Sequence, residues 1–347
     1  MRSHPLKRFQ LAAAMLLAVS AFCVCTLPAQ AAEQDYRVTA RQILDGPVRW
    51  DYLSVDSARH HVFLTRGDHV DVYDGVSKSV IGTIANTAGV HGVALAPERD
   101  RGYTSNGGSD SVTVFMLSSL KEVTTVKIGG KPDSIVYDSK TARVFAANAK
   151  DKSLSVIDAE SNKLINTIAL PGSPETAVVD GKGRLYIALE DKNAIAVIDT
   201  EAMKVLRQYD VSAECDEPAG LSIDALSERL FVGCHNSKMA IVDGMTGKVI
   251  AAPAIGKGND ATAFDPVRKL AFASNGDGTL TVIDGNAPHQ VLQTLSTMPR
   301  ARTMALDSIS HALFLVSAEP VADAPQSGKS RPSLKPGTFT LLTIEPK

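Results

Sequence analysis

The sequence predicts an all-β fold, a seven-bladed β-propeller of four-stranded antiparallel blades, from three observations. One pattern of short apolar strands recurs seven times along the chain. Corresponding residues of consecutive copies lie 40 to 44 residues apart. Polar turns separate up to four strands in each copy, as is typical of propeller blades. A β-helix would have a much shorter period, and a two-domain enzyme would not keep one period throughout.

Each copy begins with a strand that ends in Asp. A second strand follows a turn, a third ends in Ile-Asp or a similar pair, and a fourth follows a Lys. One copy comprises Asp133–Asp138, Val144–Asn148, Leu154–Asp158 and Lys163–Ile168. Aligning all copies on the first strand gives one residue per blade, which we call the anchor residues: Asp51, His91, Asp133, Glu175, Ala219, Asp260 and Arg302.

The two ends of the repeat array predict how the ring closes. The seventh copy contains only three strands, at Thr303–Asp307, Ala312–Val316 and Phe339–Ile344. A spare strand, Tyr36–Leu44, precedes the first copy. We expect this N-terminal strand to pair with the last strand of the chain, because this pairing completes blade seven and covers its open edge.

Residues 1–31 are expected to be a cleaved signal peptide. Arg2, Lys7 and Arg8 precede an apolar run, and Ala29-Gln30-Ala31 forms a small-x-small cleavage site. The apolar run is short for a bilayer span, which needs about 20 residues. The expectation is therefore a periplasmic or secreted protein, residues 32–347, that forms one domain without a membrane span.

The composition supports a core and argues against some partners. Hydrophobic residues make up 44% of the chain, and the formal net charge is −2. This charge excludes a basic nucleic-acid surface spread over the whole molecule, so nucleic acid is an unlikely class of partner. The chain is expected to be a monomer.

The innermost strands of a propeller converge on the axis, so the anchor residues should gather on one face. Functional residues concentrate on such loops, and acids, a His and an Arg together suit a small polar ligand. Trp50, the single tryptophan, either stacks on a ligand or packs between blades. The opposite face carries the first-to-second strand turns, with His60 and His311 expected in solvent. The ligand-binding candidates are Trp50, Asp51, His91, Asp133, Glu175, Asp260 and Arg302.

Metal binding is a weaker hypothesis. Carboxylates suit Ca²⁺ or Mg²⁺, and a His among them suits a transition metal. The weak candidate ligands are His91, Glu175 and His235, although anchor residues on opposite sides of the ring are expected to be too far apart to share one ion. No other cofactor is expected.

Two cysteines follow the signal segment. Cys215 lies in the loop before the first strand of blade five, and Cys234 ends the second strand. An antiparallel hairpin returns the chain to the same end, which brings the two side chains within bridging distance. A structural disulfide is expected. The alternative is a metal-binding or redox dithiol beside His235.

A Pro-rich segment, residues 319–337, links the second and third strands of blade seven. The corresponding links in other blades are only a few residues long. Long loops inside compact domains are commonly functional or disordered. This loop should emerge on the face that carries the anchor residues.

The second strands of three blades resemble a known repeat. Tyr103-Thr-Ser-Asn106, Phe145-Ala-Ala-Asn148 and Phe272-Ala-Ser-Asn275 are similar to the aromatic-Val-Thr-Asn motif of the YVTN-repeat propellers, which are exported bacterial proteins. The resemblance implies fold and compartment but no particular activity. We expect these three Asn side chains to have a structural role. The repeat Asn is replaced by Arg66, Leu189, Cys234 and Ser317, so these blades are either specialised or diverged.

The sequence contains no nucleophile elbow, phosphate loop or haem-attachment motif. It therefore identifies no catalytic residues and favours a binding or scaffold protein that recognises a small polar ligand or a protein partner. The alternative is a metal-dependent hydrolase or lyase with its site in the propeller funnel.

Overall fold

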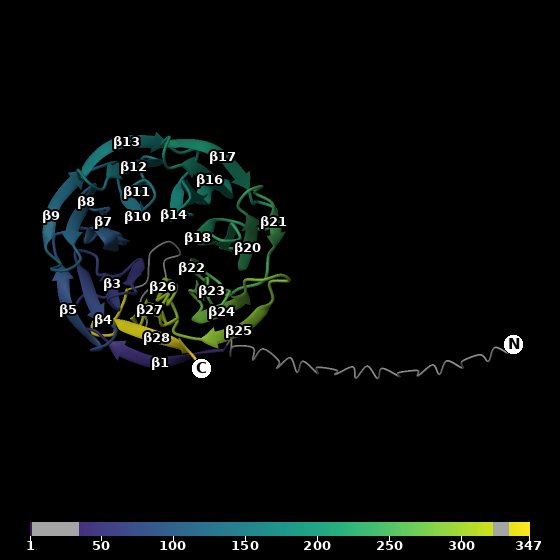
Figure 1. Cartoon of the computed structure of the whole chain (residues 1–347). Helices are drawn as coiled ribbons and strands as arrows, with labels where there is room; N and C mark the ends of the chain where they lie inside the picture. The colour runs from purple at the N-terminus through teal and green to yellow at the C-terminus, as the bar shows by residue number, and fades with distance from the viewer. Residues whose placement is uncertain (2–34, 322–332) are drawn as a thin grey trace. The chain divides into compact units, whose positions relative to one another are not determined.

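A computed structural model describes Met1, residues 35–321 and residues 333–347. In these residues, strands β1 to β28 form seven antiparallel sheets of four strands, arranged in a ring (Figure 1). The predicted propeller is confirmed. Residues 2–31 of the predicted signal peptide and residues 322–332 of the Pro-rich loop lie outside the described residues.

Four consecutive strands form each of the first six blades. Blade 1 contains β2 (Leu53–Asp56), β3 (His61–Thr65), β4 (Val70–Asp74) and β5 (Ser79–Ile84). Blade 2 contains β6 (Val90–Ala96), β7 (Arg101–Asn106), β8 (Ser111–Met116) and β9 (Glu122–Lys127). Blade 3 contains β10 (Pro132–Asp138), β11 (Arg143–Asn148), β12 (Ser153–Asp158) and β13 (Lys163–Ala169).

The next three blades repeat this order. Blade 4 contains β14 (Pro174–Val179), β15 (Arg184–Leu189), β16 (Ala194–Asp199) and β17 (Lys204–Asp210). Blade 5 contains β18 (Pro218–Asp224), β19 (Arg229–Cys234), β20 (Lys238–Asp243) and β21 (Val249–Ala251). Blade 6 contains β22 (Asn259–Asp265), β23 (Leu270–Asn275), β24 (Thr279–Asp284) and β25 (Val291–Ser296). Single 3₁₀ turns at Pro97–Arg99 and Glu190–Lys192 interrupt two loops.

Blade 7 joins the two ends of the chain. It contains β26 (Met304–Leu306), β27 (Leu313–Ser317), β28 (Thr340–Pro346) and, on the outside, β1 (Tyr36–Ile43). Strand β1 pairs antiparallel with β28, and Figure 1 shows these two strands side by side at the edge of the ring. Tyr36 is fully buried, and its ring contacts Phe272 of blade 6 at 5.0 Å between centroids. The predicted closure through the N-terminal strand is confirmed.

The repeated Asp at the end of most first strands has a structural cause. In blade 3, Asp138 is fully buried and accepts a hydrogen bond from the backbone N–H of Lys140 in the following turn. Asp265 does the same for Val267 in blade 6. Carboxylates that accept turn N–H groups satisfy donors that the sheet leaves unpaired. The Asp therefore fixes the tight turn in the blades that carry it, whereas the first strand of blade 2 ends in Ala96 and is followed by a 3₁₀ turn.

Hydrophobic side chains pack between neighbouring blades. A separate buried cluster lies between each adjacent pair, including the closing pair of blades 7 and 1. In the closing cluster, Leu53 and Leu64 pack with Phe314 and Phe339. Each blade therefore buries both faces of its sheet against its neighbours, which stabilises the closed ring. An isolated blade would expose both of these apolar faces.

Every outermost strand carries a β-bulge near its beginning. In blades 1 to 6, the extra residue is an aliphatic side chain between 36% and 46% exposed. These residues are Ile81, Val123, Ile165, Leu206, Ile250 and Leu292. A bulge twists an edge strand and interrupts its pairing pattern. The bulges therefore hinder the seven exposed edges from pairing with another chain.

Candidate ligand-binding site

The anchor residues occupy one register position near the axis. His91, Asp133, Glu175, Ala219 and Asp260 are each the second residue of an innermost strand. Asp51 and Arg302 each precede a shorter innermost strand, β2 or β26, by two residues. We call the end of the ring where they lie the channel mouth.

Charged anchor side chains of neighbouring blades contact one another. His91 Nδ1 lies 2.6 Å from Asp51 Oδ2 and 3.6 Å from Asp133 Oδ1, so this imidazole stands between two carboxylates. Arg302 Nε lies 3.1 Å from Asp260 Oδ2. These side chains are between 15% and 41% exposed, so they remain accessible from the mouth.

Tyr52 connects blades 1 and 4. Its hydroxyl donates a hydrogen bond of 3.0 Å to Glu175 Oε1 and lies 3.3 Å from Thr176 Oγ1. The sequence analysis did not identify Tyr52. A signal was present, because the residue after the anchor is small in every other blade: Gly92, Ser134, Thr176, Gly220, Ala261 and Thr303.

Burial gives the acids at the mouth unusual proton affinities. Burial, together with the charges of Asp133 and Asp260, raises the pKa of Glu175 to about 8. Burial also raises the pKa of Asp133 to about 6, against the opposing charge of His91. Although burial lowers the pKa of His91, its hydrogen bond to Asp51 and the charge of Asp133 raise it more. The pKa of Tyr52 lies well above its usual range, chiefly because of burial and then because of the Glu175 charge.

A pocket of about 620 Å³ opens at the mouth between blades 6, 7 and 1. Four ligand-binding candidates from the sequence line it, namely Trp50, Asp51, Asp260 and Arg302. The sequence analysis missed two other charged lining residues, Arg49 and Arg300. The remaining candidates, His91, Asp133 and Glu175, do not line this pocket; His91 is joined to it through its contact with Asp51.

The position of Trp50 is compatible with both roles that the sequence left open. It lines the pocket, and its ring also packs against Phe339 of blade 7 at 5.7 Å between centroids. Leu334 lines the same pocket. Leu334 belongs to the described end of the 319–337 segment, where it pairs with Pro320. The segment therefore reaches the channel mouth, as predicted.

A second, smaller cavity of about 170 Å³ lies between the innermost strands. Tyr52 forms part of its wall, with small side chains such as Ser54, Ser134 and Thr176. This cavity is much smaller than the pocket at the mouth. The larger pocket is therefore the main candidate for a ligand site.

The three weak metal candidates lie in different places. His91 groups with Asp51 and Asp133, whose potential ligand atoms all lie within 4.8 Å of one another. His235 forms a similar, more exposed group with Glu190 and Glu217. The third candidate, Glu175, belongs to neither group and instead accepts the hydrogen bond from Tyr52.

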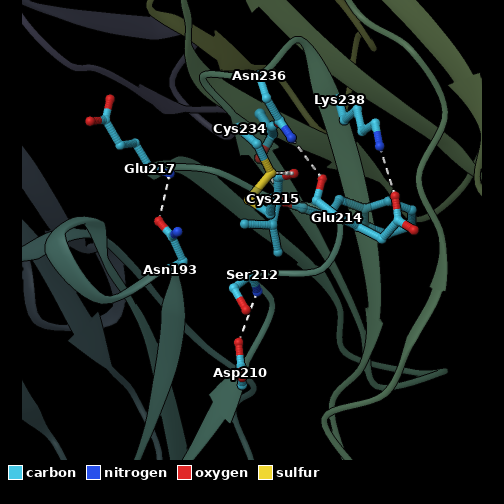
Figure 2. The surroundings of a disulfide bond; sticks show 12 residues. Asn193, Asp210, Ser212, Glu214, Cys215, Glu217, Cys234, Asn236 and Lys238 are labelled. Atoms are coloured by element: carbon cyan, nitrogen blue, oxygen red, sulfur yellow. Dashed lines mark hydrogen bonds and ion pairs between the residues drawn. A yellow bond between two sulfur atoms is a disulfide. The ribbon is translucent and has the colours of Figure 1, made fainter.

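Cys215 and Cys234 form the predicted disulfide, with their Cα atoms 5.3 Å apart (Figure 2). The bond joins the loop before β18 to the end of β19. An ion pair of 2.8 Å between Glu214 and Lys238 supports the same loop. Glu217, which follows this loop, accepts the contact with His235 and donates its backbone N–H to Asn193 of blade 4.

The turns on the opposite face are less uniform than expected. The side chain of His60 is 44% exposed, as predicted for a solvated turn. The prediction for His311 was wrong, because its Nδ1 lies 2.7 Å from Asp265 Oδ2, a fully buried carboxylate. His60 occupies the corresponding position in blade 1, and its Nδ1 lies 3.7 Å from Asp307 Oδ2 of blade 7. Both histidines therefore face the turn Asp of the preceding blade, a contact between repeats that was not considered in the sequence analysis.

The fold and the mouth together define a class of protein, a seven-bladed propeller with a pocket lined by charged and apolar residues at one end of its axis. A family model described as PQQ_2, outer membrane protein assembly factor BamB, matches residues 109–329. The chain belongs to this family. No curated protein matches the chain at a significant level.

Solved structures share the propeller. Hydrazine synthase of Kuenenia stuttgartiensis is 15% identical, with a TM-score of 0.68, over 80% of this chain and 94% of that chain. The structure of U3-55K is 11% identical, with a TM-score of 0.72, over 91% and 99%. Similarity at this level shows the fold alone.

Proposed function

We propose that this protein is an exported, YVTN-type binding or scaffold propeller that recognises a small polar ligand or a protein partner at its channel mouth. The family description names an outer membrane assembly factor, which favours a role in protein interaction outside the cytoplasm. The disulfide is compatible with such an oxidising compartment. In the described residues, no helix has the length and hydropathy to span a membrane.

The mouth pocket is the observation that carries this proposal. Side chains from three blades converge on about 620 Å³, which is within the range of small-molecule sites. Trp50 supplies an apolar surface, and Asp260 and Arg302 supply charges of both signs. Known ligand pockets combine apolar walls with a few polar groups in this way.

A thermal-shift screen tests the proposal. Pooled small polar compounds (sugars, dicarboxylates, amines and amino acids) should include one that raises the melting temperature, since a ligand stabilises the native state by mass action. The double variant Asp260→Ala/Arg302→Ala removes both partners of one ion pair and should abolish the shift. His60→Ala, on the opposite face, is the matched control and should retain it. If only His60→Ala lost the shift, the ligand would bind at the face opposite the channel mouth, and the proposal would be contradicted.

One observation favours a second function, a metal-dependent hydrolase or lyase. Asp51, His91 and Asp133 could supply two carboxylates and an imidazole to one ion, a set that suits a transition metal. Elemental analysis of purified protein tests this alternative. About one bound metal per chain, lost in His91→Ala, would support it, and metal-free protein without affinity for added Zn²⁺ or Mn²⁺ would exclude it.

A further inference from the structure

The mouth pocket presents both signs of charge to one cavity. Two acidic residues line it, Asp51 and Asp260, and so do three basic residues, Arg49, Arg300 and Arg302. A polyanion would meet the carboxylates, and a polycation would meet the arginines. A ligand with one charge of each sign, held a few ångströms apart, matches the whole lining.

Arg302 can hold the negative end of such a ligand. Its contact with Asp260 uses Nε, and the side chain is 41% exposed. No hydrogen bond or ion pair of the two terminal guanidinium nitrogens is found among the described residues, so both can donate to a ligand. Guanidinium groups bind carboxylates through two parallel hydrogen bonds, which fixes the orientation of the ligand.

Asp51 can hold the positive end. His91 contacts its Oδ2, whereas Oδ1 has no hydrogen-bond partner among the described residues. The side chain of Asp51 is 22% exposed, so an ammonium group can reach it from the pocket. Ion pairs with a partly buried carboxylate are stronger than those on the open surface because water screens them less.

Three other lining residues are large and apolar. Val48, Trp50 and Leu334 face the same cavity. They offer a place for an aliphatic or aromatic side chain, whose burial contributes about 25 cal/mol per Å². The volume of about 620 Å³ leaves room for a dipeptide as well as for a single amino acid.

We propose that the mouth pocket binds a small zwitterion of the α-amino acid class, a free amino acid or a dipeptide with an apolar side chain. Its carboxylate is held by Arg302 and its ammonium group by Asp51, while its side chain lies against Trp50. This inference rests on the proposed function, because it assigns a ligand class to the same pocket.

Trp50 makes the test direct, because it is the only tryptophan and it lines the pocket. Its fluorescence is followed while the full-length mature protein is titrated with apolar amino acids and dipeptides. The same compounds, N-acetylated or C-amidated, are the matched controls. Zwitterions should give a saturable change, and each blocked form should bind at least tenfold more weakly. Arg302→Gln and Asp51→Asn should each weaken binding at least tenfold, and His60→Ala should leave it unchanged.

Two results overturn the inference, and they differ in what they say about the proposed function. If blocked compounds or sugars change the fluorescence as strongly as zwitterions do, the ligand class is wrong but the mouth remains a binding site. If no compound of any class changes the fluorescence or the melting temperature, both the ligand class and the proposed function fail. Circular dichroism of each variant verifies that a lost response does not reflect unfolding.

Discussion

Arg66 stands in place of the repeat Asn in blade 1 and has a structural role. Where the repeat Asn is present, its amide donates to a hydroxyl of the third strand, as Asn106 does to Thr113 at 2.8 Å. In blade 1, Arg66 and Asp71 occupy the two corresponding positions and form an ion pair of 2.7 Å. Arg66 also donates to the backbone carbonyls of Asp45 and Pro47 and stacks on Phe339 of blade 7. It therefore ties the entry segment and both closing blades together.

We predict that Arg66→Met destabilises the protein by about 3–5 kcal/mol. It removes the closest charged partner of the buried Asp71 carboxylate and leaves only the longer contacts with Thr83 and His69. The double variant Arg66→Met/Asp71→Leu should cost clearly less, since it removes both charges. Urea unfolding of the three proteins at constant m-value measures the difference. Equal losses in the single and double variants would mean that the contacts with Asp45 and Pro47, rather than the ion pair, carry the stability.

Glu175 makes stability depend on pH. Its pKa of about 8 in the folded protein exceeds the ordinary value near 4.3. Folding therefore favours the protonated form. The contribution of protonated Glu175 to the free energy of unfolding is complete below its ordinary pKa. This contribution is lost as the pH rises through about 8.

The expected result is that the free energy of unfolding of the wild type falls between pH 5 and pH 8. Glu175→Gln keeps an acceptor for Tyr52 but cannot ionise, so its decline should be smaller. Urea titrations at several pH values provide the measurement. Parallel curves for the two proteins would show that Glu175 ionises normally in the folded state.

At the scale of elements, blade 5 depends on its disulfide. The bond spans 19 residues and anchors the loop before β18. Its removal in Cys215→Ala/Cys234→Ala should cost about 3 kcal/mol in the chain-entropy account of cross-links. Thermal melting with and without reductant measures this loss. The wild type should lose stability on reduction and the variant should not, whereas a reductant effect in both would point to another cause.

In blade 4, the repeat Asn and the residues that it would contact are all replaced by apolar residues. Leu189 stands in place of the repeat Asn, and Ala194 and Ala196 replace the hydroxyl residues that such an Asn contacts. All three side chains are fully buried in the cluster between blades 3 and 4. An apolar triad has thus replaced a polar one, so this departure from the repeat is a packing change that involves no functional residue at the mouth.

At the scale of the whole molecule, the period of the sequence predicts the ring because seven copies bury one another in the same way. The register of the anchor residues follows from the same period. Four residues of the mouth pocket, Trp50, Asp51, Asp260 and Arg302, were predicted from the anchor positions and the single tryptophan. The rest of the channel mouth could not be predicted, because it depends on side chains that cross between repeats. Tyr52 reaches Glu175 from 123 residues away, and Arg49 and Arg300 lie outside the aligned positions. The repeat thus predicts the positions that all blades share. It does not predict contacts between residues of different blades.

Closure of the ring gives a whole-molecule prediction. Deleting residues 36–43 removes β1, exposes the edge of β28 and uncovers the surface on which Tyr36 packs. The shortened chain should aggregate or melt at a much lower temperature, because an open edge strand pairs with other chains. The control is a chain that begins at Asp35 and therefore retains β1. Identical melting curves for the two chains would contradict closure through β1.

Amide hydrogen exchange, with and without the compound that gives the largest thermal shift, tests the proposed binding face most directly. Our account predicts that the compound slows exchange in the segments that line the mouth pocket, residues 48–52, 256–260 and 299–303. The turns of the opposite face, residues 57–60, 139–142 and 308–311, should be unaffected. Protection confined to those turns would contradict the assignment of the channel mouth as the binding face.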